Sequence, residues 1–243
     1  MAQGRVALVT HVNHFAGRPA AEALAGRGMT VLCHDAEFTC DATRNAFAAD
    51  HPGLHPLAEQ RPEDIVERAT AAFGHIDVLV NNDAFPAIRA AVEDAHLDDL
   101  RAGLEAMVVA PFALARAVVP QMKARRDGKI LFVTSAAPLR GLPNYSTYVA
   151  ARGAANALAV SLARELARFS IQVNAVAPNF VESPTYFPPE LLADAATLKK
   201  ITDNVPLGRL ARPEELGALI AFLASPDADF ITGHVMPFAG GWA

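Results

Sequence analysis

Ser135, Tyr148 and Arg152 have the residue types and the spacing needed to remove a proton from an alcohol. Tyr148 and Arg152 are four residues apart in an alanine-rich segment that predicts a helix, so their side chains share one face. An ordinary tyrosine has a pKa of about 10, and a permanently protonated guanidinium nearby favours the phenolate. The Ser135 hydroxyl can hydrogen-bond the same substrate oxygen. Together the three side chains predict an acid–base site for a hydroxyl group.

The neighbouring segments indicate how such a site would be positioned. Residues 129–134 are apolar and predict a buried strand, which places Ser135 at the carboxyl end of that strand. Open parallel α/β sheets bind their ligands at this edge. The alternative interpretation is a tyrosine and an arginine on a solvated helix face, with the serine as a helix cap. The succession of strand, loop and helix favours the catalytic interpretation.

Segments that predict strands and helices alternate along most of the chain. The predicted strands are residues 5–10, 30–34, 54–57, 76–81, 129–134, 171–177 and 234–241. The predicted helices are residues 16–27, 41–49, 62–73, 97–123 and 148–169, with a last helix opened by Pro213. This alternation is typical of βαβ units in a parallel sheet, and continuous apolar strands predict cover on both faces. We expect one α/β domain over residues 1–243, a Rossmann-like doubly wound parallel sheet of about seven strands with helices on both faces.

The amino-acid composition limits which binding partners and which cellular compartment are expected. The 243 residues are 52% hydrophobic, which is enough for a full core, and the net charge of -5 gives no reason to expect nucleic acid or an anionic membrane. We expect no membrane span, because no run approaches the required length of about 20 apolar residues. Two cysteines and an amino terminus without a signal pattern predict the cytoplasm. Cys33, His34 and Asp35 alternate between strand faces and have no second cluster, so we expect no metal site.

The spacing of Ser135, Tyr148 and Arg152 resembles the short-chain dehydrogenase/reductase superfamily, which carries a serine and Tyr-x-x-x-Lys. The resemblance covers nearly the whole chain, including NND at 81–83, VNAVAP at 173–178 and the carboxyl-terminal FAGG. It departs where a nicotinamide cofactor would bind. The superfamily's Thr-Gly-x-x-x-Gly-x-Gly reads THVNHFAG at 10–17, so His11 and Phe15 replace two of the three glycines that let backbone amides approach a pyrophosphate.

Three further departures concern the same ligand. Arg152 replaces the lysine that holds the nicotinamide ribose, Met107 stands where the relay asparagine is expected, and Pro178-Asn179 replaces a Pro-Gly pair. Asp35, at a strand end, would be the ribose-binding acid of a nucleotide-binding enzyme. It does not replace the glycines that are missing from the pyrophosphate-binding loop. Four changes at one ligand site predict a protein without a cofactor.

One branch of the superfamily, the halohydrin dehalogenases, resembles this chain in THVNHFAG, VLCHDAEF, NNDAF, APNF and SPTYFP as well as in the catalytic spacing. The resemblance implies that no nucleotide is used and that a halide binds in the vacated nicotinamide space. It also implies that Ser135 and Tyr148 hydrogen-bond the substrate hydroxyl while Arg152 lowers the pKa of Tyr148. The deprotonated oxygen then displaces halide from the adjacent carbon and closes an epoxide. Small anions such as azide, cyanide or nitrite would open epoxides in reverse.

The same resemblance implies further site residues. The halide would be bound by a nest formed by Phe15, Pro178, Asn179, Phe180 and Val181, with backbone amides near the last two. An apolar wall would surround the small halohydrin or epoxide substrate, and its residues would be Phe85, Pro86, Leu142, Tyr186 and Phe187. For each of these residues, packing in the protein core is an equally good interpretation. Asp83 would either contact the site residues from outside the substrate pocket or cap the end of a strand.

Other interpretations remain at this point. A divergent NAD(P)-dependent short-chain reductase would have to move its first loop to tolerate Phe15. A catalytically inert scaffold would neither release halide nor bind nucleotide. The long segments 97–123 and 148–169 are apolar over more than one face. Helices at these positions pair between subunits in the superfamily, so we expect a homotetramer, or at least a dimer.

Overall fold

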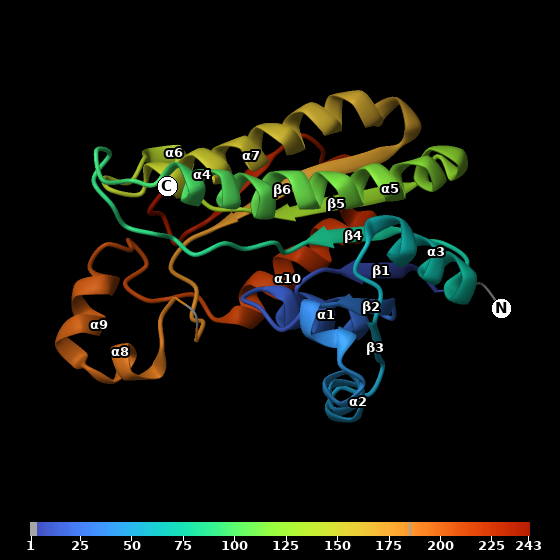
Figure 1. Ribbon diagram of the computed structural model, residues 1–243, viewed down its shortest axis with the longest axis horizontal. Coiled ribbons are helices and arrows are strands. Elements are labelled where there is room, and N and C mark those ends of the chain that lie inside the picture. The colour runs from blue at the N-terminus through green and yellow to red at the C-terminus, as the bar shows by residue number, and fades with distance from the viewer. Residues whose placement is uncertain (1–3, 185) are drawn as a thin grey trace.

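The structure is a computed structural model that describes residues 4–184 and 186–243. Its centre is one sheet of seven parallel strands in the order β3-β2-β1-β4-β5-β6-β7 (Figure 1). The strands are β1 (Val6–Val9), β2 (Thr30–His34), β3 (Leu54–Leu57), β4 (Val78–Asn81), β5 (Gly128–Val133), β6 (Ile171–Pro178) and β7 (Val235–Phe238). The strand order reverses between β1 and β4, which is where doubly wound sheets open a ligand crevice. The predicted fold class is confirmed.

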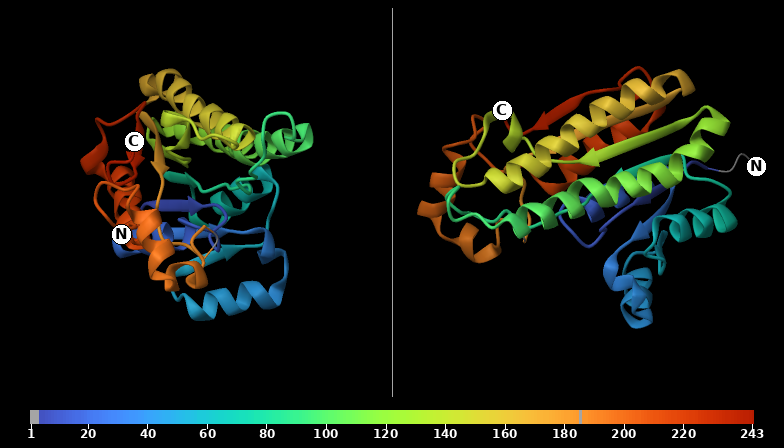
Figure 2. Two further views of the ribbon diagram at one scale, coloured as in Figure 1. Left: turned by 90° about the vertical axis from the view of Figure 1, so that its left-hand side faces the viewer. Right: turned by 45° about the horizontal axis from the view of Figure 1, so that its top comes forward.

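Helices lie on both faces of the sheet (Figures 1 and 2). They are α1 (Gly17–Gly26), α2 (Asp41–Asp50), α3 (Pro62–Phe73), α4 (Leu97–Leu104), α5 (Ala110–Arg125), α6 (Ala137–Arg140), α7 (Ser146–Leu166), α8 (Pro189–Ala193), α9 (Ala195–Thr202) and α10 (Pro213–Ala224). α3, α5 and α7 cover one face, and α1 and α10 cover the other. α6, α8 and α9 were not predicted, because helices of only a few turns show too little periodicity in the sequence.

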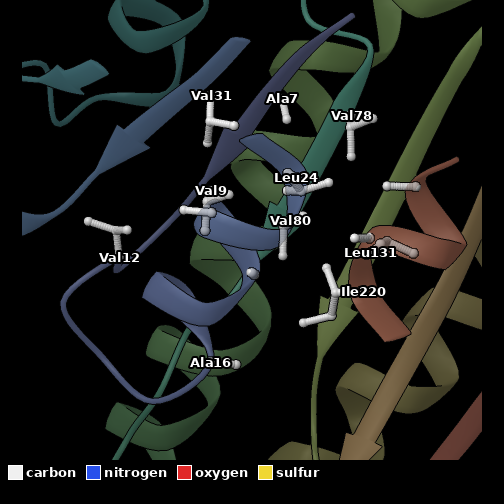
Figure 3. Close-up of a cluster of buried hydrophobic side chains, with 14 of the residues drawn as sticks. Ala7, Val9, Val12, Ala16, Leu24, Val31, Val78, Val80, Leu131 and Ile220 are labelled. Carbon is white, nitrogen blue, oxygen red and sulfur yellow. The ribbon is translucent and has the colours of Figure 1, made fainter. Parts of the chain in front are cut away.

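The core has one layer on each side of the sheet. On one side, Val9, Val80 and Leu131 of three adjacent strands face Leu24 of α1 and Ile220 of α10, and all are at most 1% exposed (Figure 3). Burying one such side chain stabilises the fold by about 1.5–3 kcal/mol. The two layers hold the strands in register, so the loops at their carboxyl ends start from fixed points.

The helical run Leu97–Arg125 consists of α4, a π-helical turn at Glu105–Val109, and α5. Within the described residues it is one helix long and apolar enough to cross a membrane by length and composition alone, with a mean hydropathy of 1.7 over its most apolar 18-residue window. The expectation that no run approaches this length was therefore wrong. The inner face of the run packs on the sheet through Leu114 and Val118.

The described residues of the proline-rich segment 177–190 are mostly irregular. Its start extends β6 as far as Pro178, and its last two residues begin α8. Val181 forms an isolated parallel bridge with Ala211, which ties the loop to the segment before α10. Together with α8 and α9, the loop lies beyond the carboxyl ends of the strands (Figure 1).

Candidate active site

Ser135 lies at the carboxyl end of β5, where the chain turns into α6. The Thr134 amide donates a hydrogen bond to the Val176 carbonyl of β6 at 2.8 Å, so the turn is tied to the sheet. Ser135 Oγ accepts from the Ala137 amide at 3.1 Å, and the side chain is buried. Because that bond uses the oxygen as an acceptor, the hydroxyl proton remains available for a substrate oxygen.

Arg152 is fixed by two backbone carbonyls, one in the loop after β4 and one at the end of β5. It is only 4% exposed, and its Nη1 donates to the carbonyls of Asp83 at 3.0 Å and Val133 at 3.1 Å. Its guanidinium carbon lies 5.5 Å from the centre of the Tyr148 ring, one turn earlier on α7. A buried charge held in this way cannot swing to solvent, so it is a constant part of the environment of Tyr148.

An inner cavity of about 190 Å³ brings most of the predicted site together. Its lining consists of Phe15, Thr134, Ser135, Tyr148, Arg152, Pro178, Asn179, Phe180, Val181, Tyr186 and Phe187. These residues come from the loops after β1, β5 and β6 and from α7, which converge at the carboxyl edge of the sheet. The structure thus gathers the three proposed catalytic residues, all five proposed halide residues and two of the proposed substrate residues around one small space.

An outer cavity of about 770 Å³ shares Ser135, Tyr148, Asn179, Phe180 and Tyr186 with the inner one. Its remaining lining is His14, Ala84, Phe85, Pro86, Ala87, Ala137, Leu142, Tyr145, Asn204 and Trp242. Phe85, Pro86 and Leu142 were predicted as pocket residues, whereas His14, Tyr145, Asn204 and Trp242 were not. A further cavity of about 900 Å³ beside α9 contains none of the predicted site residues, so cavity size does not identify the site.

The carboxyl-terminal Trp242 forms part of the outer wall. Its ring packs edge to face on Phe180 with centroids 5.7 Å apart, and the Arg140 guanidinium lies 4.8 Å from its centre. Arg140 also donates to the Trp242 carbonyl at 2.8 Å. The position of this residue depends on long-range contacts, so the only local signal was an aromatic residue following FAGG.

Tyr186 places a second phenol beside Tyr148. Burial raises the pKa of Tyr186, and the nearby phenol of Tyr148 adds to this increase, while the positive charge of Arg152 opposes it. At neutral pH Tyr186 is therefore a neutral phenol that can only donate or accept a hydrogen bond.

The turn after β6 has an unusual backbone. Phe180 adopts a left-handed φ of 57°, and its amide donates to Asn179 Oδ1 at 3.0 Å. The Asn179 amide donates to the Phe238 carbonyl at 3.0 Å. Of the amides predicted to bind a halide, that of Phe180 is therefore already engaged by its neighbour, while Val181 also lines the cavity.

The loop after β1 keeps a glycine-like backbone without its glycines. His11 and Phe15, at the two positions where glycine is lost, have φ angles of 46° and 43° in the left-handed region. Asn82 Nδ2 holds the loop by donating to the His11 carbonyl at 3.1 Å and to the His14 carbonyl at 2.7 Å. The Phe15 ring projects into the inner cavity. The lining residues therefore do not fit a dinucleotide, whose phosphates need bare backbone at this loop.

Asp83 lies behind the cavity rather than in its wall. Its carbonyl accepts from Arg152, and its Oδ1 is 3.3 Å from His11 Nε2. The hydrogen bond to Asp83 raises the pKa of His11, although burial opposes the shift. The sequence predicted Asp83 as a supporting residue and missed His11 as its partner. Among the described residues, no group of His, Cys, Asp and Glu side chains is arranged to hold a metal ion.

Comparison with known proteins places the chain in a class. A sequence profile described as enoyl-(acyl carrier protein) reductase matches residues 16–243. The 3-oxoacyl-[acyl-carrier-protein] reductase of Escherichia coli strain K12 is 32% identical over 244 residues, which cover 98% of this chain and 97% of that protein. Together with the fold, these matches define a short-chain dehydrogenase/reductase scaffold.

Two solved structures refine this placement. One, described as a dehalogenation enzyme, has a TM-score of 0.96 and 51% identity and covers 99% of both chains. The other is a halohydrin dehalogenase (HheC) bound to ethyl (2S)-oxiran-2-ylacetate, with a TM-score of 0.94 and 42% identity over 97% of this chain and 96% of that one. The chain belongs to the short-chain dehydrogenase/reductase superfamily and, within it, to the halohydrin dehalogenase branch, as its sequence predicted.

Proposed function

We propose that this protein is a halohydrin dehalogenase, a cofactor-independent carbon–halide lyase that converts vicinal haloalcohols into epoxides, halide and a proton. One observation carries the proposal: Ser135, Tyr148 and Arg152 line the same small cavity as the ring of Phe15, which stands where a nucleotide would need bare backbone. An alcohol deprotonated there has no hydride acceptor beside it. Its oxygen is instead a nucleophile toward the neighbouring carbon.

The proposed steps balance in atoms and charge. Ser135 and Tyr148 hydrogen-bond the substrate hydroxyl, and the Tyr148 phenolate takes its proton. The oxygen forms a bond to the adjacent carbon from behind, and the halide leaves with the electron pair of the carbon–halogen bond. The Arg152 guanidinium carbon lies 5.5 Å from the Tyr148 ring centre, so a positive charge stands beside the phenol during the transfer. The proton then passes to solvent.

The departing halide needs positive partial charge but not a full cation, because a strongly bound product would leave slowly. We propose that the halide lies between the Phe15 ring and the turn Pro178–Val181. Ring edges and backbone N–H groups both carry positive partial charge, which attracts an anion. Because the Phe180 amide is engaged by Asn179 Oδ1, the Val181 amide is the proposed principal donor. In the reverse direction the same place would hold azide, cyanide or nitrite as it opens an epoxide.

The NAD(P)-dependent reductase activity of many relatives on this scaffold is the alternative function. Nucleotide binding would require both left-handed residues, His11 and Phe15, to move their side chains out of the phosphate path. Their loop is tied to Asn82 by two hydrogen bonds, which opposes such a movement. The dehalogenase function requires no rearrangement.

We also propose that the protein acts as a homotetramer in the cytoplasm. The outer faces of α5 and α7 expose Phe112 and Val160, and Val109 is exposed in the preceding turn, which leaves an apolar surface suited to another copy. Cys33 and Cys40 are both free thiols, as expected of a reducing compartment. Size-exclusion chromatography with light scattering tests the assembly.

The deciding experiment uses purified protein without added nucleotide. With 1,3-dichloro-2-propanol as substrate, we expect equal amounts of chloride, by ion chromatography, and protons, by titration. Tyr148→Phe removes the base and should abolish both, while circular dichroism shows that the variant is folded. Full activity in Tyr148→Phe, or activity that depends on added NADPH, would contradict the proposal.

A further inference from the structure

The first loop carries a histidine that the proposed reaction does not use. His11 stands at the first lost-glycine position, and its Nε2 is 3.3 Å from Asp83 Oδ1. We propose that His11 is a positioning residue: the His11–Asp83 pair fixes the Asp83 backbone carbonyl, which in turn holds Arg152 beside Tyr148. The inference rests on the proposed dehalogenase function and adds to it a residue from outside the cavity.

The contacts form a continuous path from the loop to the base. His11 reaches the Asp83 carboxylate, the Asp83 carbonyl accepts from Arg152 Nη1 at 3.0 Å, and the Arg152 guanidinium lies 5.5 Å from the Tyr148 ring centre. Asp83 Oδ2 is buried and has no hydrogen-bond partner among the described residues, so His11 is the principal restraint on this side chain. Without that contact the buried Asp83 carboxylate lacks a charged partner, and we expect the loop at Asp83 to shift so that the carboxylate reaches water, which displaces the carbonyl that Arg152 binds.

The left-handed backbone conformation of His11 indicates that its side chain has a functional role. A left-handed φ of 46° is unfavourable for histidine, whereas glycine adopts it freely. The loop keeps the conformation because Asn82 Nδ2 donates to the His11 carbonyl. Strained backbone of this kind is typically retained at residues whose side chains have a function. Among the described residues, the contact with Asp83 is the only ion pair that His11 makes.

The charges around His11 favour its protonated form. Asp83 faces it from the loop after β4, and Asp35 faces it from the end of β2; both raise its pKa, with the Asp83 hydrogen bond as the largest cause. His34, also from β2, has its ring centroid 5.7 Å away, and burial together with the charge on His11 lowers the pKa of His34. The two pKa values shift in opposite directions, so His11 binds a proton more readily than His34 does.

The sign of the pH effect follows from the raised pKa. The charged pair between His11 and Asp83 is fully present at pH values below the ordinary histidine range and is lost as pH rises through the higher pKa of the folded protein. Above it, neutral His11 still offers one N–H to Asp83. A glutamine at position 11 offers an N–H at every pH but never a charge.

The test compares wild type with His11→Gln across pH 5.5 to 9.5, measuring kcat and KM for chloride release from 1,3-dichloro-2-propanol. We expect kcat of the variant to be about fivefold lower at the acidic end, with KM nearly unchanged, and the ratio to approach one at the alkaline end. His55→Gln, at an exposed position on β3, is the matched control and should follow the wild-type profile.

A ratio that does not depend on pH overturns the inference, whether it stays near one or is uniformly low. If His11→Gln does not fold, His11→Asn replaces it, because asparagine tolerates the left-handed backbone, and the same ratio is measured. Absence of chloride release by wild type would instead contradict the proposed function. The two failures are therefore distinguishable in one data set.

Discussion

The rings of Phe15 and Tyr186 meet edge to face in the inner cavity, with their centroids 5.4 Å apart and their planes at 87°. One ring comes from the loop after β1 and the other from the loop after β6. Their contact links these two loops at the wall of the inner cavity, on the side of the sheet where the resemblance to dehydrogenases places a nicotinamide cofactor. An aromatic pair thus occupies a space that belongs to a nucleotide elsewhere in the superfamily.

We expect Phe15→Ala to weaken halide binding. The substitution removes the ring contact with Tyr186, worth about 1 kcal/mol, and opens the inner cavity to water, which competes for the anion. The inhibition constant for bromide as a product inhibitor should rise about fivefold, since 1 kcal/mol corresponds to that factor. Phe230→Ala, at a fully exposed position, serves as the control and should leave the constant unchanged. An unaltered constant in Phe15→Ala would remove Phe15 from the halide site.

Substitutions of Arg152 should separate charge from positioning. Arg152→Met leaves the buried carbonyls of Asp83 and Val133 without their donor, at a cost of about 1–3 kcal/mol for each. Arg152→Lys keeps the charge but lacks the planar fork, so we expect a smaller loss of thermal stability and a kcat reduced roughly tenfold. Thermal melts and chloride release measure the two effects. Equal activity of the lysine variant and wild type would show that charge alone is sufficient.

Trp242 should govern the acceptance of large substituents. Its ring lines the outer cavity and is held by Arg140, so Trp242→Ala widens that cavity and removes a stacking surface. We expect KM for 2-chloro-1-phenylethanol to rise several-fold, because aromatic contacts contribute about 0.5–1.5 kcal/mol. KM for the smaller 1,3-dichloro-2-propanol should change little. Parallel changes for both substrates would indicate a general loss of structure instead.

The start of α10 should confer an acid-sensitive part of the stability. Hydrogen bonds from Arg209 and the Arg212 amide lower the pKa of Glu215 to about 2. Because the folded-state pKa is depressed, this contribution is present above the ordinary carboxyl range and is lost as pH falls toward 2. Glu215→Gln should therefore melt at a lower temperature than wild type at pH 7, with the difference shrinking progressively below pH 4.5. A constant difference between pH 7 and pH 3 would exclude this linkage.

Much of the fold was predictable because local patterns determine it. The strands at β2 and β3 and the helix α3 were predicted with the bounds that the structure shows, since each is a short apolar or amphipathic run between clear turn residues. The spacing of Tyr148 and Arg152 on α7 required only helical periodicity. The position of Ser135 required only that a parallel strand ends where its apolar run ends.

The features that were missed depend on distant contacts. Nothing near Trp242 in the sequence indicates that Arg140 holds it against Phe180. His11 was seen only as a lost glycine, because its partner Asp83 follows a strand that is far away in the chain and adjacent in the sheet. The hydrogen bond from the Phe180 amide to Asn179 Oδ1 depends on the conformation of one turn.

The left-handed backbone at His11 and Phe15 also bears on protein design. The loop has the φ angles that glycine would adopt at both positions, so His11→Gly and Phe15→Gly ask for no new backbone conformation. The obstacle to a phosphate group is two side chains rather than a rearranged main chain. Conversion of this scaffold toward nucleotide binding can therefore begin with these two substitutions, which place glycine where the backbone already has a left-handed φ.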